Sequence, residues 1–307
     1  MQWSPVTRAR RTGVAALAGL RLLVPLGLHA QDVQPRVYTP APVGVNLLTI
    51  GYAFSTGAVL FDKTIPIEDA TADIHSLNVA YSRSIGVLGK AGRLDVAVPF
   101  VIGDWEGTVA QAYQTTSRTG FGDPVVRLAV FVIGAPALSR PEFVRFRPKT
   151  IVGTMLRVGV PLGQYDATRL VNLSSHRWTF SPQLGISHVA GRVFLEATAG
   201  VWLFTDNGAF LGTSTQSQDP LFTIQAHVGY QFRPGLWLAA SSRQSLGGAV
   251  SVNGGERTAM EANNRIGLTV AVPIAGRFSL KLMGTTGVTA TVGNDYRTIA
   301  VAWQVVF

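Results

Sequence analysis

Serine and histidine side chains could support acyl transfer, because an imidazole that contacts a hydroxyl can act as its general base. Adjacent pairs occur at His75-Ser76 and Ser175-His176, and His227 follows Gln225 by two residues. Neighbours on a strand point to opposite faces, so neither adjacent pair can form a direct Ser–His contact. No G-x-S-x-G pattern accompanies them. We therefore expect that the protein is not an enzyme, and a hydrolase is kept as an alternative.

Metal, cofactor and nucleic-acid chemistry have little support in the sequence. The five histidines lack the spacing of metal ligands, and no cysteine is present for a metal site or a disulfide. After the first 30 residues there is no run of five to eight lysines and arginines, so nucleic acid is not an expected partner. We expect no bound metal and no cofactor.

The remaining candidate residues are charged or amide side chains inside segments where apolar residues alternate. In the segment from Phe222 to Phe232, every second residue is apolar, and Gln225 and His227 lie on the opposite face. This period of two is that of a β-strand. If the apolar faces contact lipid, the opposite faces line an enclosed interior, since an Arg or Lys facing lipid at mid-depth costs about 2–4 kcal/mol. The expected interior set is Asp95, Arg127, Arg157, Arg177, Glu196, Gln225, His227, Arg243, Arg265 and Lys281.

Twelve such segments follow one another, and most have the length that crosses a bilayer as a tilted strand. Long connections alternate with short ones, an asymmetry typical of outer-membrane barrels and not of sandwiches. The expected strands are 45–55, 73–84, 93–102, 122–132, 150–161, 177–188, 192–205, 221–232, 235–245, 264–273, 277–286 and 296–307.

Composition agrees with this interpretation. Only 14% of residues are charged, against about 25% in ordinary soluble domains, and the chain after residue 30 has no apolar run of about 20 residues that could form a membrane helix. The sequence therefore predicts an all-β protein, a transmembrane antiparallel outer-membrane β-barrel of about 12 strands. It would cross the outer membrane of a Gram-negative cell many times, with outer-membrane lipid as its surroundings.

The first 30 residues have the features of a secretory signal peptide. Arg8, Arg10 and Arg11 precede an apolar stretch that ends near Ala30. The expected organisation is a signal peptide at 1–30, a short periplasmic N-terminal lead at 31–43 that is too short for a plug domain, and a barrel at 44–307. The leader contains four arginines and no acid, so the remaining chain has 22 basic and 17 acidic residues, a net charge of +5.

The last ten residues alternate to the end of the sequence. Trp303, Val305 and Phe307 lie on one face, and aromatic rings are stable at the membrane–water boundary. A terminal aromatic after alternating apolar residues also looks like the signal that the barrel-assembly machinery reads. We expect these three residues to form that signal and the machinery to be a partner.

Short motifs follow one another in order over about residues 36–303. The motifs are Arg36-Val-Tyr-Thr-Pro-Ala-Pro-Val-Gly44 with Asn46, Gly120-Phe-Gly-Asp-Pro124, Gly134-Ala-Pro-Ala-Leu138, Pro141-Glu-Phe143, Pro161-Leu-Gly-Gln-Tyr-Asp166, Asn172-Leu173, Arg177-Trp178, Phe204-Thr-Asp-Asn207, Asp219-Pro220, Gln225, His227, Gly247-Gly248, Asn253-Gly254 and Asn264-Arg265. With these motifs the chain resembles the MetA-pathway phenol-degradation family of transporter-like outer-membrane barrels. The resemblance implies a monomeric barrel that admits small aromatic or hydrophobic molecules.

The expected function is that of an outer-membrane channel for passive uptake of small, aromatic or hydrophobic molecules through a polar, mainly basic interior. A basic conduit attracts anions, including phenolates and carboxylates. Two alternatives stay open. Interior side chains could pair with one another and seal the barrel, since the filling of a barrel depends on its strand number, or the protein could be an outer-membrane lipid hydrolase with a Ser–His pair at its rim.

Overall fold

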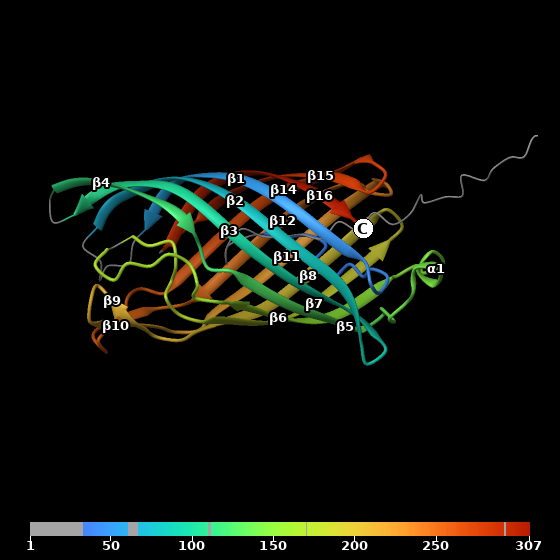
Figure 1. Ribbon diagram of the computed structural model, residues 1–307, viewed down its shortest axis with the longest axis horizontal. Helices are drawn as coiled ribbons and strands as arrows, with labels where there is room; N and C mark the ends of the chain where they lie inside the picture. Colours follow the sequence, from blue (N-terminus) through green and yellow to red (C-terminus); the bar gives the residue numbers. More distant parts are fainter. Residues whose placement is uncertain (1–32, 61–66, 110–111, 170, 292) are drawn as a thin grey trace, which may run out of the picture.

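The computed structural model describes residues 33–60, 67–109, 112–169, 171–291 and 293–307. The signal peptide expected at 1–30 lies outside these residues. Most of the described chain is β-strand, arranged around a long barrel (Figure 1). The strands are β1 (Asn46–Leu60), β2 (Ile67–Val87), β3 (Lys90–Val109), β4 (Ala112–Phe121), β5 (Val125–Ile133), β6 (Thr150–Gly159), β7 (Thr179–Ala190), β8 (Val193–Phe204), β9 (Asn207–Phe210), β10 (Ser214–Gln218), β11 (Leu221–Arg233), β12 (Leu236–Gly247), β13 (Val250–Val252), β14 (Glu261–Ala275), β15 (Phe278–Thr289) and β16 (Gly293–Val306), and the helix is α1 (Arg140–Phe143).

The wall is a closed antiparallel sheet. Each strand pairs with the strand before and after it around the wall, and β1 pairs with both β2 and β16, which closes the circle. Strands β4 and β5 are two parts of one wall strand, because β4 pairs with the outer half of β3 and β5 with its inner half. The barrel therefore has twelve wall strands, and the predicted fold class is confirmed.

Alternation explains which face each residue takes. On β1, Leu47, Thr49 and Ala53 are buried, whereas Ile50 and Tyr52 are exposed on the outer face. The same alternation runs through the other wall strands, so the outside of the barrel is an apolar belt. A closed wall satisfies its backbone groups between strands and has no free edge, which is the condition for lying in hydrocarbon. The wall is therefore that of a membrane-spanning β-barrel.

The wall extends further outward than the periodicity predicts. Long outer loops were expected at 56–72 and 103–121, but β1 continues to Leu60, β2 has 21 residues and β3 has 20. A tilted strand needs only about 9–11 residues to cross the bilayer. These strands, with β4, therefore project beyond the membrane at the left end of the view in Figure 1. The motif that was expected to begin a strand at 122 instead separates β4 from β5, with Pro124 just before β5.

A second, small sheet lies at the same outer end. It has three strands in the order β13, β10, β9 and comes from the connections at 206–220 and 246–263, which were expected to be loops. The inner end carries α1 and five connections between wall strands. Among the described residues, no helix combines the length and the apolar character needed to cross a membrane.

The last strand ends at the inner edge of the barrel. Backbone N–H groups of Asn46 and Phe307 each donate to the other residue's carbonyl, both at 3.0 Å. Trp303 stacks on Phe278 on the outer face, with ring centroids 5.5 Å apart. The terminal residues are thus part of the seam between β1 and β16, and their recognition by assembly machinery stays a prediction.

Candidate functional site

The interior of the barrel holds the charged residues that the alternation selected. Asp95, Arg127, Arg157, Glu196, His227, Arg243, Arg265 and Lys281 are all buried, while Gln225 and Arg177 are half-buried. The strand register brings some of them side by side. One row crosses β3, β5 and β6 with Asp95, Arg127 and Arg157, and a second crosses β11, β12 and β14 with Gln225, Arg243 and Arg265.

Asp95 lies between two arginines. Its carboxylate is 2.9 Å from Arg93 Nε and 3.5 Å from Arg127 Nε, and all three side chains are almost inaccessible to solvent. A buried carboxylate without such partners would be strongly destabilising. Arg93 was not among the predicted interior residues, although it lies on the same face of the strand as Asp95, two residues earlier.

The N-terminal lead lies inside the barrel. We expected it in the periplasm, but Val33, Pro35 and Tyr38 are among the most deeply buried residues of the described chain. Interior arginines bind it directly: Arg127 Nη1 donates to Gln34 Oε1 at 3.1 Å, and Arg93 Nη1 donates to the Val37 carbonyl at 3.1 Å. The lead is too short to fold alone, yet wall residues supply the partners that its polar groups need. Its position was therefore wrongly predicted.

Arg36 attaches the lead to the opposite wall. Its guanidinium lies 4.8 Å from the ring centroid of Phe194 and 5.6 Å from that of Trp237. Its Nη1 donates to Gln231 Oε1 at 3.1 Å, and its backbone N–H donates to Glu196 Oε2. A cation enclosed by aromatic faces and hydrogen-bond acceptors away from water is held more firmly than an exposed one.

Tyr38 occupies a cradle that only glycine can form. A Cβ atom added at Gly185 would lie 2.0 Å from Tyr38 Cε2, and one added at Gly153 would lie 2.5 Å from Tyr38 Cδ1. The ring also meets Phe131 edge to face, with centroids 6.3 Å apart. Gly153 on β6 and Gly185 on β7 are thus needed because the Tyr38 ring of the lead packs directly against the wall at these positions.

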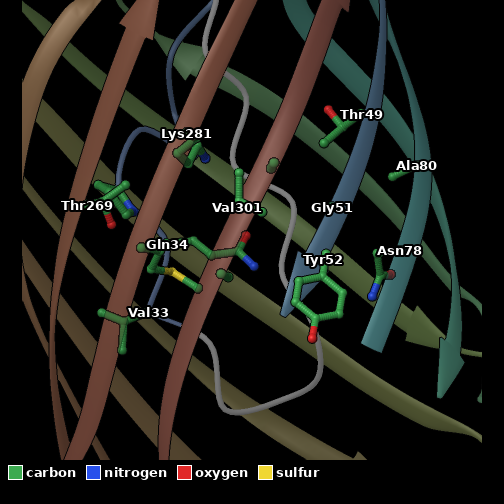
Figure 2. A pocket seen from close by; sticks show the side chains of 14 residues that line it. Val33, Gln34, Thr49, Gly51, Tyr52, Asn78, Ala80, Thr269, Lys281 and Val301 are labelled. Carbon is green, nitrogen blue, oxygen red and sulfur yellow. The ribbon is translucent and has the colours of Figure 1, made fainter. Parts of the chain in front are cut away.

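A small cavity remains beside the lead. Figure 2 shows Gln34 between the strands that carry Thr269 and Lys281 and those that carry Thr49 and Asn78. The cavity volume is about 40 Å³. That volume accommodates water, whereas an apolar cavity needs about 150 Å³ to hold benzene. With the lead in this position, the cavity admits no aromatic molecule.

Arginines stack on aromatic rings towards the outer mouth. Arg157 lies 5.0 Å from the ring centroid of Trp202, and Arg177 lies 4.6 Å from that of Phe204. Arg177, which precedes β7, also donates to Gln218 Oε1 on β10. Burial lowers the pKa of Arg177 to about 10, although the nearby acids oppose this shift. A basic and aromatic strip therefore leads from the outer end towards the interior.

A Ser–His contact exists, but not between the neighbours found in the sequence. His227 Nδ1 and Ser241 Oγ are 2.9 Å apart on adjacent strands, and Glu196 is the register partner of His227 on the other side. Glu196 accepts hydrogen bonds from Ser187 Oγ at 3.0 Å and from the lead. The pair lies deep in the interior and is almost inaccessible, whereas a lipid hydrolase was expected to need such a pair at the rim.

Metal binding receives no support from the described part of the chain. It contains no group of three or more histidine, cysteine, aspartate or glutamate residues that could hold a metal ion. The interior residues that sequence reasoning missed include Arg93, Trp237 and the lead residues Gln34, Arg36 and Tyr38. Strand alternation could have identified Arg93 and Trp237, but no periodic signal marks the lead.

Comparisons with known proteins agree with this architecture. The family described as "Putative MetA-pathway of phenol degradation" matches residues 61–305. An outer membrane channel from Pseudomonas putida F1 is similar in structure, with a TM-score of 0.73 and 16% identity, over 90% of this chain and 100% of that one. A comparison with curated proteins finds no match.

Autotransporter barrels are more distant structural neighbours. The β domain of the Bordetella autotransporter BrkA has a TM-score of 0.50 and 12% identity, over 86% of this chain and 100% of that one. The transport unit of AIDA-I from Escherichia coli has a TM-score of 0.50 and 8% identity, over 94% of each chain. At these identities the likeness concerns the fold.

Proposed function

Because this chain belongs to the MetA-pathway phenol-degradation family, we propose that it is an outer-membrane channel for passive uptake of small aromatic or hydrophobic molecules. The observation that carries the proposal is the nature of the interior filling. Much of it is the lead, which after removal of a leader would be joined to the wall only at Asn46. A tethered segment can leave the interior, whereas a wall side chain cannot, so the same barrel has a closed and an open arrangement.

The second part of the proposal concerns charge. Basic side chains from the wall and the lead outnumber the two buried acids, Asp95 and Glu196, among the described interior residues. A low-dielectric conduit with excess positive charge concentrates anions. The substrates that fit are small aromatics carrying a carboxylate or phenolate, whose rings can also stack along Trp202 and Phe204. The family's description, which names phenol degradation, is in keeping with this class.

Two measurements test the channel. Refolded protein in a planar bilayer should conduct ions, and its reversal potential in a salt gradient should show anion preference. Arg157→Glu should reduce that preference, since it places a negative charge in the basic row beside Arg127. Liposome swelling with benzoate, phenol and sugars of similar size then ranks the substrates. A reversal potential unchanged by Arg157→Glu would refute a selective role for Arg157.

The alternatives give different outcomes. A sealed structural barrel would show neither conductance nor swelling, with or without the lead. The hydrolase alternative rests on the contact between His227 and Ser241. Ester hydrolysis by the reconstituted protein that Ser241→Ala abolishes would favour an enzyme, and hydrolysis that survives this substitution would point to a contaminant.

A further inference from the structure

Charged residues divide sharply between the two ends of the barrel. At the inner end the exposed charges are basic, and Glu142 on α1 is the single exposed acid among the described residues there. The outer end is mainly acidic, with residues such as Asp73, Asp104 and Glu106 on the projecting strands. The exposed inner basic residues are Lys90, Arg140, Arg145, Arg147, Lys149, Arg192, Arg233 and Arg277.

The basic residues surround the barrel instead of forming one patch. Each of the five inner connections carries or adjoins at least one of them. Lys90 begins β3, the loop from β5 to β6 carries several on and after α1, Arg192 and Arg277 lie in turns, and Arg233 ends β11. A protein partner would meet one side of this ring. The bilayer in which the barrel lies surrounds it and adjoins all five connections at once.

Exposed apolar side chains adjoin the basic ones at every connection. Phe232 precedes Arg233 and Phe278 follows Arg277, and both rings lie on the outer face. The other three connections repeat the pattern with Leu88, Val144 and Val193. Apolar side chains that enter the acyl boundary next to cations at headgroup level are the pattern of an interfacial anchor.

The single acid does not cancel this charge. Glu142 offsets at most one of the eight basic charges, and its Oε2 is bonded within the cap of α1, where it accepts hydrogen bonds from the Ser139 backbone N–H at 2.8 Å and from Ser139 Oγ at 2.6 Å. None of the ion pairs found among the described residues involves the inner ring, whereas Arg169 and Arg257 at the outer end pair with Asp166 and Asp219. The basic charge of the inner ring is therefore available to a ligand.

From these observations we propose that the inner end of the barrel binds the anionic phospholipid headgroups of the periplasmic leaflet through a ring of basic residues. The ligand is a phosphate diester with a net negative charge, as in phosphatidylglycerol. The interaction is electrostatic and close to the membrane surface, so it weakens as salt shortens the screening length from about 10 Å at 0.1 M to about 3 Å at 1 M. It does not depend on what passes through the interior.

The test measures lipid selectivity of the full chain reconstituted in bilayers. Spin-labelled phosphatidylglycerol and spin-labelled phosphatidylcholine are compared for their association with the barrel perimeter. We expect phosphatidylglycerol to be favoured by about two- to fivefold at low salt, and the preference to disappear near 1 M salt. Combined substitutions Arg192→Ala, Arg233→Ala and Arg277→Ala should lower the preference at low salt.

Matched controls separate this ring from charge in general. Arg169→Ala with Arg257→Ala removes exposed arginines that already pair with acids, and should leave the preference unchanged. If the triple variant fails to fold, judged by heat-dependent gel migration, Arg145→Ala with Arg147→Ala tests the same ring in a loop outside the wall. Equal association of both lipids with the native protein would overturn the proposal. If the two lipids associate equally and the native protein binds polyglutamate, the ring would be assigned to an acidic protein partner instead.

Discussion

Replacing Arg36 by alanine should open the interior by releasing the lead. The change removes the stacking of one guanidinium on Phe194 and Trp237 and its hydrogen bond to Gln231. The backbone hydrogen bond to Glu196 survives, because alanine keeps the N–H group. The wall strands are unchanged, so the substitution affects the equilibrium between the closed barrel, with the lead inside, and the open barrel, with the lead outside.

The magnitude follows from the two interactions that are lost. A cation held against aromatic faces contributes about 0.5–2 kcal/mol, and a hydrogen bond from a charged donor contributes about 1.5–3 kcal/mol. Together the closed arrangement should lose about 2–5 kcal/mol, which corresponds to a shift of roughly 30- to 4000-fold in the ratio of open to closed barrels.

The assay is time-averaged conductance of refolded protein in a planar bilayer. Arg36→Ala should raise the fraction of time spent in the high-conductance state, and deletion of residues 33–43 gives the upper limit. Arg140→Ala is the matched control, since Arg140 is exposed on α1 and far from the interior contacts. If the deletion raises conductance and Arg36→Ala does not, the reasoning about Arg36 is refuted. If neither has an effect, the lead does not obstruct passage.

Three further predictions follow from other contacts. Gly185→Ala brings a Cβ to 2.0 Å from Tyr38, so it should displace the lead and raise conductance while barrel content measured by circular dichroism stays the same. Asp95→Asn leaves its two arginine partners without a carboxylate and should lower the free energy of unfolding in urea by about 3–5 kcal/mol, whereas Asp104→Asn, exposed at the outer end, should change it far less. Deletion of Phe307 removes its two backbone hydrogen bonds at the seam and should reduce the amount of heat-modifiable barrel in the outer membrane; undiminished amounts would contradict its expected role in assembly.

The strand positions could be predicted from the sequence because their cause is local. A side chain on a wall strand points either into the interior or towards hydrocarbon, and these two directions alternate along the strand. The wall therefore imposes a period of two on the sequence, which can be recognised directly. The expected segment 192–205 exceeds β8 by one residue at each end, and the segment 221–232 stops one residue before the end of β11. The inward assignment of Asp95 and Arg127 used the same period.

The lead could not be placed because its position depends on contacts distant in sequence. Arg36 meets Glu196 and Gln231, and nothing in the local pattern of the lead points to residues 160 or more positions away. The outward extensions of β1, β2 and β3 were not predicted for another reason. Their strands lie beyond the lipid, where polar residues replace the apolar ones on the outward face, as at Asp104, Glu106 and Thr108 on β3, so the apolar alternation is lost.

The seam between β1 and β16 has a consequence for biogenesis. The lead runs directly into β1 at Asn46, and that residue is hydrogen-bonded to the last one of the chain. Before β1 pairs with β16, the lead can enter the interior through the gap between these two strands. Pairing of the two strands closes that lateral opening. The strand pairing that completes the barrel thus also determines whether a newly folded molecule has the lead inside, and hence whether its interior is initially closed.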